Sequence, residues 1–449
     1  MKRTVVLDVV GLSTGLIGEH TPNIARLAKA QGGARPLETV LPAVTCSVQA
    51  SMLTGLPVEE HGVVGNGWYF RELAEVLFWR QSNRLVAGEK VWEAAKKRDP
   101  SLSCAKLFWW FNMYSSADVA VTPRPIYPAD GRKIPDIYTE PPELRDQLNR
   151  ELGQFPLFDF WGPRAGIAST KWIGECTKRV FDTQKTTLTL VYLPHLDYDL
   201  QRFGPEGAHV AAALRQVDEV VGDIVDHVTR AGARVVIVSE YVITRVSRPV
   251  HVNRALREAG LLRVREELGT DKLDPGGSEA FAVADHQIAH VYVKRPERVD
   301  EVRRLLTSLP GIEKTAEMHH ERAGEIVAIA EKDAWFTYYF WLDDARAPDY
   351  ARTVDIHRKP GYDPVELFLD PEIALPQLRV GLRLAQKVLG FRYLMDVIGL
   401  DASLVKGSHG RPSAEAFQQP VLISTAPELL PARAHATDVK RIVLDHLFA

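Results

Sequence analysis

The stretch that decides the fold is Leu41-Pro-Ala-Val-Thr-Cys-Ser-Val-Gln-Ala-Ser-Met-Leu-Thr-Gly-Leu-Pro57. It begins as an apolar, β-branched run and reaches a turn of small residues around Thr45. An amphipathic stretch follows, and Gly55 and Pro57 close it. A hydroxyl at such a turn lies near the first free amides of a helix, which together with the helix dipole favour an anion. The pattern predicts a strand–turn–helix unit, in which Thr45 is either a simple N-cap or part of an anion site.

Length, charge and cysteine content exclude several classes of protein. The 449 residues suffice for one large α/β domain with an insertion or for two domains. A net charge of −3 lacks the basic excess of an obligate nucleic-acid binder, so no nucleic acid polymer is expected as a partner. Cys46, Cys104 and Cys176 show no CxxC spacing, which indicates neither a disulfide framework nor a zinc–thiolate site. The N-terminal apolar run is too short for a signal peptide and no run reaches membrane-spanning length, so we expect a cytoplasmic protein without a membrane span.

Several apolar runs predict buried parallel strands that end at polar residues. Residues 4–10, 187–193 and 233–239 are rich in Val, Leu and Ile, and a further strand is expected at 421–424. In open α/β sheets the ligand site lies at the carboxyl ends of the strands. We therefore expect an α/β fold whose mostly parallel central sheet is sandwiched by helices.

Residues 263–343 predict an inserted, smaller α/β subdomain. Apolar runs near 290–293 and 325–330 read as strands, and residues 299–309 read as an amphipathic helix between them. The expected division is a catalytic core over 1–262, the inserted subdomain over 263–343, and the rest of the core over 344–449.

The quoted stretch and its continuation to Asn66 resemble the nucleophile segment of the alkaline phosphatase superfamily, nearest its nucleotide pyrophosphatase/phosphodiesterase branch. The matching positions are Pro42, Thr45, Ser51, Thr54, Gly55, Pro57, His61, Gly62 and Asn66. The resemblance implies a metal-dependent hydrolase of phosphate esters that works through a phosphothreonine intermediate. In it, Thr45 would attack phosphorus and Asn66 would hold a phosphoryl oxygen.

The resemblance also implies two divalent metal ions, zinc in the family pattern. The positions that match its ligands are Asp8, Thr45, Asp197, Gln201, Glu240, Tyr241 and His409. Three of them depart from the pattern, since Gln201 and Tyr241 replace histidines and Glu240 replaces an aspartate. A phenol is a poor ligand unless it loses its proton. The oxygen-rich set makes magnesium, manganese or calcium alternatives to zinc.

Some of these assignments stay open. His195 or Asp199 could substitute for Gln201, and His357 is a second candidate for the place of His409. Arg358 and Lys359, in the same turn as His357, form either a salt-bridged loop or a contact to substrate charge.

Aromatic clusters flank the Thr45 segment. They include Trp68, Trp79 and residues 108–114, which fit either a core or the apolar wall of a substrate pocket. The favoured function is hydrolysis of a small, partly apolar phosphate ester, leaning to the diester. The alternatives are a phosphomonoesterase or phosphonate hydrolase of the same fold, and a catalytically weakened metal- or ligand-binding relative, suggested by the histidines lost at Gln201 and Tyr241.

Overall fold

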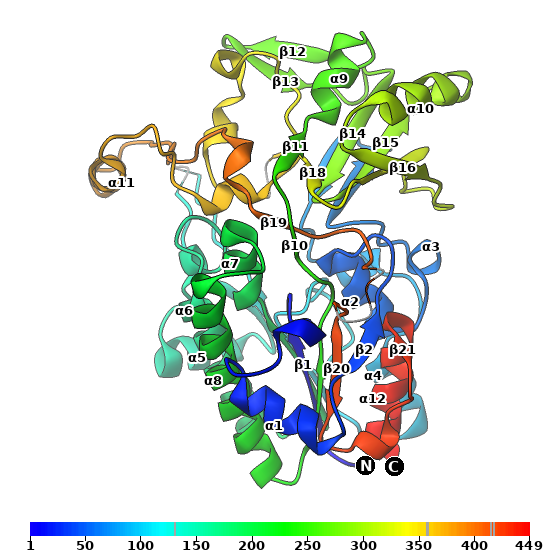
Figure 1. Ribbon diagram of the computed structural model, residues 1–449. Coiled ribbons are helices and arrows are strands. Elements are labelled where there is room, and N and C mark those ends of the chain that lie inside the picture. The colour runs from blue at the N-terminus through cyan, green and yellow to red at the C-terminus, as the bar shows by residue number, and fades with distance from the viewer. Residues whose placement is uncertain (130–131, 356–358, 414, 416–417) are drawn as a thin grey trace.

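A mixed, mostly parallel sheet forms the larger part of the computed structural model, which describes residues 1–129, 132–355, 359–413, 415 and 418–449 (Figure 1). Its strands, in spatial order, are β21 (Ala434–His435), β2 (Arg35–Glu38), β20 (Val421–Ser424), β9 (Arg234–Val238), β1 (Thr4–Val9), β8 (Leu188–Leu193), β5 (Cys104–Leu107), β6 (Val119–Pro123) and β7 (Ile137–Glu140). The run from β9 to β6 is parallel, whereas β20 and β7 are antiparallel to their inner neighbours. The expected α/β class is confirmed.

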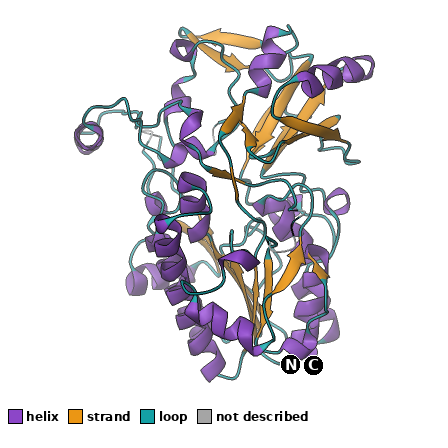
Figure 2. Cartoon of the chain, viewed as in Figure 1, coloured by secondary structure: helices purple, strands orange, loops and turns teal. Residues whose placement is uncertain are grey.

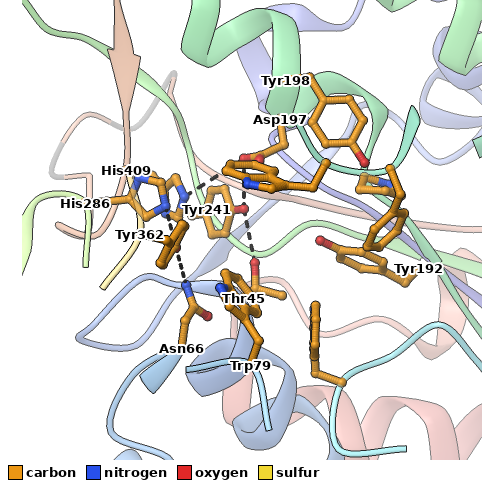
Figure 3. A pocket seen from close by; sticks show the side chains of 14 residues that line it. Thr45, Asn66, Trp79, Tyr192, Asp197, Tyr198, Tyr241, His286, Tyr362 and His409 are labelled. Atoms are coloured by element: carbon orange, nitrogen blue, oxygen red, sulfur yellow. Dashed lines mark hydrogen bonds and ion pairs between the residues drawn. The ribbon is translucent and has the colours of Figure 1, made fainter. Parts of the chain in front are cut away.

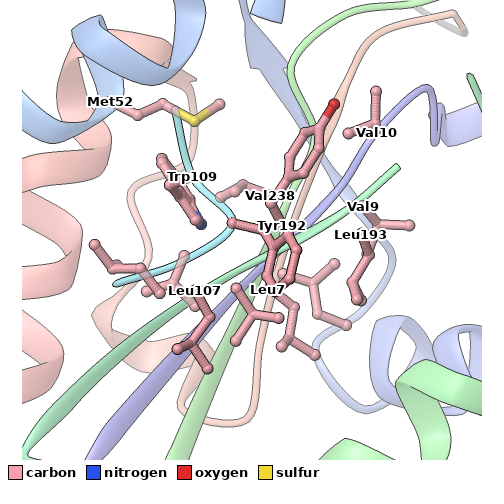
Figure 4. Packing of buried hydrophobic residues seen from close by; sticks show 14 of the residues in the cluster. Leu7, Val9, Val10, Met52, Leu107, Trp109, Tyr192, Leu193 and Val238 are labelled. Atoms are coloured by element: carbon pink, nitrogen blue, oxygen red, sulfur yellow. The ribbon is translucent and has the colours of Figure 1, made fainter. Parts of the chain in front are cut away.

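The central strands are buried on both faces because their side chains are almost all apolar. Every residue of β1 and of β8 is buried, as the continuous hydrophobic runs predict. Figure 4 shows Leu7, Leu193 and Val238 of adjacent strands packed together, with Trp109 and Met52 above them. Asp8 is the charged residue within β1, and in the register it lies beside Tyr192 and Val238.

Helices cover both faces of this sheet (Figures 1 and 2). One layer contains α1 (Pro22–Ala30), α5 (Glu143–Leu152), α6 (Ile167–Gln184), α7 (His195–Phe203) and α8 (Ala208–Arg230). The other contains α2 (Thr45–Thr54), α4 (Val91–Arg98) and α12 (Val439–Phe448), beside the short α3 (Val58–His61).

A smaller antiparallel sheet lies above the large one in Figure 1. Its strands in order are β14 (Ala280–Asp285), β15 (Ile288–Val293), β17 (Ile326–Ala330) and β16 (Ile312–Ala316), with α10 (Val299–Ser308) packed against it. The expected strands near 290–293 and 325–330 and the helix near 299–309 correspond to β15, β17 and α10. Beside this sheet lie α9 (Val252–Glu258) and the hairpin of β12 (Val264–Glu267) and β13 (Thr270–Leu273). The division into 1–262, 263–343 and 344–449 stays a prediction.

Short strand pairs connect the two sheets. β10 (Thr244–Arg245) pairs with β19 (Gly407–Ser408), and β11 (Arg248–Val250) pairs with β18 (Ala334–Phe336). The hairpin of β3 (Gly67–Phe70) and β4 (Glu75–Phe78) follows the Thr45 segment, and α11 (Pro376–Val388) projects from the body at the left of Figure 1. In the part of the chain that the structure describes, no helix is both long and apolar enough to cross a bilayer.

Candidate active site

Thr45 lies at the carboxyl edge of the large sheet, where the sequence places it. It is the first residue of α2, and the N-cap is Val44 rather than Thr45. The Thr45 side chain is therefore not used to cap the helix. Gly55 ends α2 in the left-handed conformation at φ 72°, which a glycine adopts without steric cost.

A chain of hydroxyl groups connects Thr45 to Asp197 (Figure 3). The Thr45 Oγ1 atom is 3.2 Å from the Tyr241 hydroxyl, which lies 3.1 Å from Asp197 Oδ1. When Asp197 is ionised, it can only accept, so Tyr241 donates to it and the Tyr241 oxygen can accept a hydrogen bond from Thr45. The arrangement is a directed path for a proton from Thr45 to Asp197.

Asp197 is further held by Gln201, one turn later on α7. The Gln201 amide donates to Asp197 Oδ2 at 2.6 Å, so both carboxylate oxygens accept a hydrogen bond. Burial raises the pKa of Asp197 to about 7, although the bonds from Tyr241 and Gln201 oppose the shift. We call Asp197, Tyr241 and Gln201 the Asp197 group.

His409 lies beside this group on the segment that follows β19. Its Nδ1 bonds to the Ala43 carbonyl at 2.9 Å, which leaves Nε2 as the lone-pair nitrogen, 3.9 Å from Asp197 Oδ1. The imidazole stacks on the Tyr241 ring with centroids 3.6 Å apart. Burial lowers the pKa of His409 to about 3, so the ring is neutral at physiological pH.

A second acidic cluster lies deeper, under Thr45. Gln49 donates to Asp8 Oδ2 at 3.2 Å and to Glu240 Oε1 at 2.7 Å, and its own carbonyl accepts from the Trp110 amide at 2.8 Å. The remaining oxygens, Asp8 Oδ1 and Glu240 Oε2, are buried and have no hydrogen-bond partner among the described residues. Burial raises the pKa of Asp8 to about 7 and that of Glu240 well above its usual value. We call Asp8, Glu240 and Gln49 the Asp8 group.

Three hydrogen bonds hold the side chain of Asn66, which lies on the side of Thr45 away from Asp197 (Figure 3). Its Oδ1 accepts from the Cys46 amide at 2.9 Å, and its amide nitrogen donates to Asp285 Oδ1 at 3.0 Å and to the Tyr362 hydroxyl at 3.1 Å. Tyr362 also bonds to His286 Nε2 at 2.9 Å. These contacts come from the smaller sheet and the segment after it, so both parts of the chain build the site.

These groups surround a small cavity of about 40 Å³. Most of its wall is aromatic, and the lining residues are Thr45, Asn66, Trp79, Trp110, Phe160, Trp161, Tyr192, Pro194, Asp197, Tyr198, Tyr241, His286, Tyr362 and His409 (Figure 3). No Arg or Lys is among these described lining residues. Without an added cation, the cavity offers a phosphoryl group neutral donors only.

A buried lysine holds the backbone of the cavity wall at Trp110 in place. Lys106 of β5 donates to the carbonyl oxygens of Trp110 at 2.7 Å and of Phe111 at 2.8 Å. Burial lowers the pKa of this ammonium group to about 7. Phe108 and Phe111 have left-handed backbone angles, φ 65° and 54°, which a non-glycine residue adopts only where its surroundings impose them.

The structure brings most of the predicted site residues together. Thr45, Asn66, Asp197, Tyr241 and His409 line the cavity, and Asp8, Glu240 and Gln201 lie directly behind it.

The residues named as alternatives either lie away from the cavity or fall outside the described residues. His195 bonds to Gln216 at 2.9 Å and Asp199 pairs with Arg202 at 3.0 Å, and neither lines the cavity. Lys359 forms a buried ion pair with Glu366 at 2.7 Å, as in the salt-bridged alternative. His357 and Arg358 lie outside the described residues.

Sequence reasoning missed several residues of the site. Gln49 lies four positions after Thr45 on α2 and so shares its helix face, a spacing that could have found it. Asp285 ends β14 and His286 follows it in the turn to β15, and only the folded chain brings Asp285 to Asn66 and His286 to Tyr362. Of the expected aromatic wall, Trp79 and Trp110 line the cavity, whereas Trp68 and Trp109 belong to the core.

The donor chemistry fits a metal ion in one of the two predicted positions. Among the described residues no cluster of three or more His, Cys, Asp or Glu side chains converges. At the Asp8 group, however, two unpartnered carboxylate oxygens and the nearby Thr45 hydroxyl form a hard oxygen set that suits a divalent cation. At the Asp197 group, a phenol and an amide already donate to both oxygens, so this position as folded does not fit an ion.

Comparison with known proteins identifies the family. The profile of the type I phosphodiesterase / nucleotide pyrophosphatase family matches residues 4–363. The chain belongs to this family. Its members typically bind two metal ions. No curated protein matches the sequence significantly.

Solved structures share the fold over the whole chain. Murine ectonucleotide pyrophosphatase/phosphodiesterase 5, solved as an inactive threonine-to-alanine variant in complex with AMP, is 14% identical with a TM-score of 0.57. The match covers 100% of this chain and 95% of that one. The human protein of the same name is 13% identical with a TM-score of 0.56 and the same coverage. At such identity the likeness shows the fold alone.

Proposed function

We propose that this protein hydrolyses a phosphoric diester with an apolar substituent, with Thr45 as the nucleophile. The observation that carries the proposal is the directed hydrogen-bond path from Thr45 through Tyr241 to Asp197. A threonine hydroxyl is a weak nucleophile unless a base accepts its proton or a bound cation lowers its pKa. Family membership supports the reaction class, and the inactive threonine-to-alanine variant of the murine relative supports a threonine as the key residue.

The chain's own residues divide the work of the first step. Thr45 Oγ1 forms a bond to phosphorus while the bond from phosphorus to the leaving oxygen breaks. The Thr45 proton passes to Tyr241 and the Tyr241 proton to Asp197, so the relay takes the place of the histidine ligand that the family pattern has there. The leaving oxygen takes its proton from solvent.

The second step reverses the relay. A water molecule attacks the phosphothreonine and releases one proton to solvent while the bond from phosphorus to Thr45 Oγ1 breaks. Thr45 regains its proton from Tyr241, and Asp197 returns a proton to Tyr241. Asn66 lies in the cavity wall, and its amide nitrogen would hold a phosphoryl oxygen by exchanging its hydrogen bond to Tyr362 for one to the substrate.

The Asp8 group would hold one divalent cation, with Asp8, Glu240 and Thr45 as its ligands. When bound, such an ion supplies the positive charge that the cavity lining lacks and lowers the pKa of the Thr45 hydroxyl. Since the Asp197 group does not fit an ion, we propose one firmly held ion in place of the expected two.

Nucleophile and relay variants test this proposal. Turnover of bis-p-nitrophenyl and mono-p-nitrophenyl phosphate is measured across several divalent ions for wild type and for Thr45→Ala, Thr45→Ser and Tyr241→Phe. We expect Thr45→Ala to lose about 10³-fold or more in rate, Thr45→Ser to retain part of it, and Tyr241→Phe to lose about 10²-fold. The diester should be the better substrate. Wild-type rates for Thr45→Ala would refute the nucleophile, and unchanged rates for Tyr241→Phe would refute the relay.

A second candidate function is ligand binding without turnover. It is favoured by the lack of Arg and Lys among the described lining residues and by the hydrogen bonds that occupy both oxygens of Asp197. Saturable binding of a phosphate ester with no turnover under any ion would support this candidate over hydrolysis.

A further inference from the structure

The helix α11 exposes an apolar face that no other part of the described chain covers. It projects from the body of the molecule at the left of Figure 1. The apolar side chains exposed along and beside it are Leu375, Leu378, Leu382, Leu384, Val388, Leu389, Phe391 and Leu394, with exposed fractions from 42% to 86%. A helix at a protein surface ordinarily turns such a stripe toward the core. A contiguous exposed apolar patch of this kind marks an interaction surface.

The orientation of the helix is fixed by its charged side chains. Leu378, Leu382 and Leu389 recur at spacings that place them on one helical face. On another face, Arg379 and Arg383 both pair with Asp396, the latter through Nε at 2.9 Å. The ion pairs hold the basic face against the following segment, so the leucines point outward.

The charge of the segment selects the kind of partner. Residues 373–395 contain four basic side chains and no Asp or Glu, and after Asp396 has paired with Arg379 and Arg383, Lys387 and Arg392 remain to carry positive charge. A surface that combines apolar side chains with positive charge is complementary to an anionic lipid bilayer. A second copy of the chain would bring two basic segments together, which like-charge repulsion disfavours.

We propose that residues 375–394 form a membrane-docking segment that lies in the plane of an anionic bilayer. The leucines and Phe391 enter the boundary between headgroups and acyl chains, and Lys387 and Arg392, which do not pair with Asp396, meet lipid phosphates. At thirteen residues, α11 is too short to span a bilayer, which is consistent with an interfacial position. The proposal rests on the surface of α11 and is independent of the proposed hydrolase activity.

Vesicle flotation of the full chain tests the segment. The vesicles are phosphatidylcholine alone or with about one-third phosphatidylglycerol. We expect the wild type to float with the anionic vesicles, and to float less at high salt because ions screen the basic side chains. The Leu378→Glu/Leu382→Glu variant should partition at least about tenfold more weakly. Lys387→Gln/Arg392→Gln should lose about fivefold per charge removed, on the anionic vesicles only.

A matched control separates the segment from general surface effects. Leu73 and Leu268 are also exposed, at 59% and 104%, but lie far from α11 in the sequence. The Leu73→Glu/Leu268→Glu variant should float like the wild type. No flotation of the wild type, or an equal loss in this control, would overturn the proposal. A lipid-independent dimer in light scattering that Leu378→Glu/Leu382→Glu abolishes would also overturn it, since a second copy would then cover the face.

Discussion

The Asp8 group and the Asp197 group occupy the two positions at which the family pattern expects metal ligands, yet their hydrogen bonding differs. In the Asp8 group one amide serves two carboxylates, and two acidic oxygens remain without a partner among the described residues. In the Asp197 group two donors serve one carboxylate, so neither carboxylate oxygen lacks a partner, and the orphaned oxygen there is the neutral amide oxygen of Gln201. The first arrangement has an excess of acceptors, which a cation satisfies, and the second is already balanced by neutral donors. Where the family pattern has histidine nitrogens with lone pairs, Tyr241 and Gln201 instead donate protons to Asp197.

The largest expected effect comes from removing one carboxylate from each group, which tests whether only the Asp8 group binds a divalent ion. Asp8→Asn should lose about 10³-fold in kcat/KM and its dependence on divalent ions, because a cation ligand is lost. Asp197→Asn should lower the rate but keep the ion dependence. Steady-state kinetics over a titration of each ion distinguishes the two variants. If Asp197→Asn alone loses the ion dependence, the two roles are reversed.

A loss of activity at low pH can come from unfolding as well as from titration of the two acidic groups. The buried His290 provides a measure of the unfolding part. His290 Nε2 donates to the Val64 carbonyl at 2.8 Å, and its Nδ1 accepts from the Gly324 amide at 3.3 Å. Burial lowers its pKa to about 4, so the folded state binds this proton less readily than the unfolded state. The free energy of unfolding is therefore undiminished above an unfolded pKa of about 6.5 and falls by about 3 kcal/mol as the pH drops to 4.

Urea unfolding from pH 7 to 4 measures this loss. His290→Gln should show a flatter dependence of stability on pH, since glutamine does not titrate. An identical slope in the variant would show that other groups carry the acid sensitivity.

Restoring histidines should convert the Asp197 group into an ion site. In Gln201→His/Tyr241→His, Asp197 and His409 gain two imidazole neighbours, and zinc affinity at this position should rise by about 10- to 100-fold. Metal analysis and calorimetric titration should give one firmly bound ion for the wild type and two for the variant. Two ions of equal affinity in the wild type would contradict the distinction between the groups.

The smallest expected effect concerns the aromatic wall rather than either acidic group. Trp161 is partly exposed and donates from Nε1 to Glu366 at 3.0 Å. Trp161→Ala should reduce the preference for diesters with apolar over polar leaving groups by about tenfold, equivalent to about 1.4 kcal/mol of lost contact. Trp161→Phe should keep most of that preference. An unchanged specificity ratio in the Ala variant would assign Trp161 a structural role only.

Much of the large sheet was predictable because its central strands are continuous apolar runs. The strand over residues 104–107 was not, since Lys106 interrupts the pattern even though it is fully buried. Its ammonium group is tolerated there because it bonds to two backbone carbonyls, a contact that composition does not reveal.

The site was predictable where the motif is local, as for Thr45 and Asn66. The hydrogen bonds of Tyr241 and the approach of Asp285 and Tyr362 to Asn66 join residues 44 to 296 positions apart, so no sequence window contains them.

The fastening of Trp110 and Phe111 by Lys106 has a consequence for how fast a ligand can enter and leave. A cavity of about 40 Å³ has room for a few water molecules, whereas pockets for small organic ligands are about 300 Å³ or larger. The bonds from Lys106 hold Trp110 and Phe111 in place, so we expect the extra volume to come from Phe160 and Trp161, which are partly exposed lining residues in the loop before α6. We then expect the association rate and the residence time of a ligand to depend on that loop, while the Trp110 side of the cavity keeps its shape.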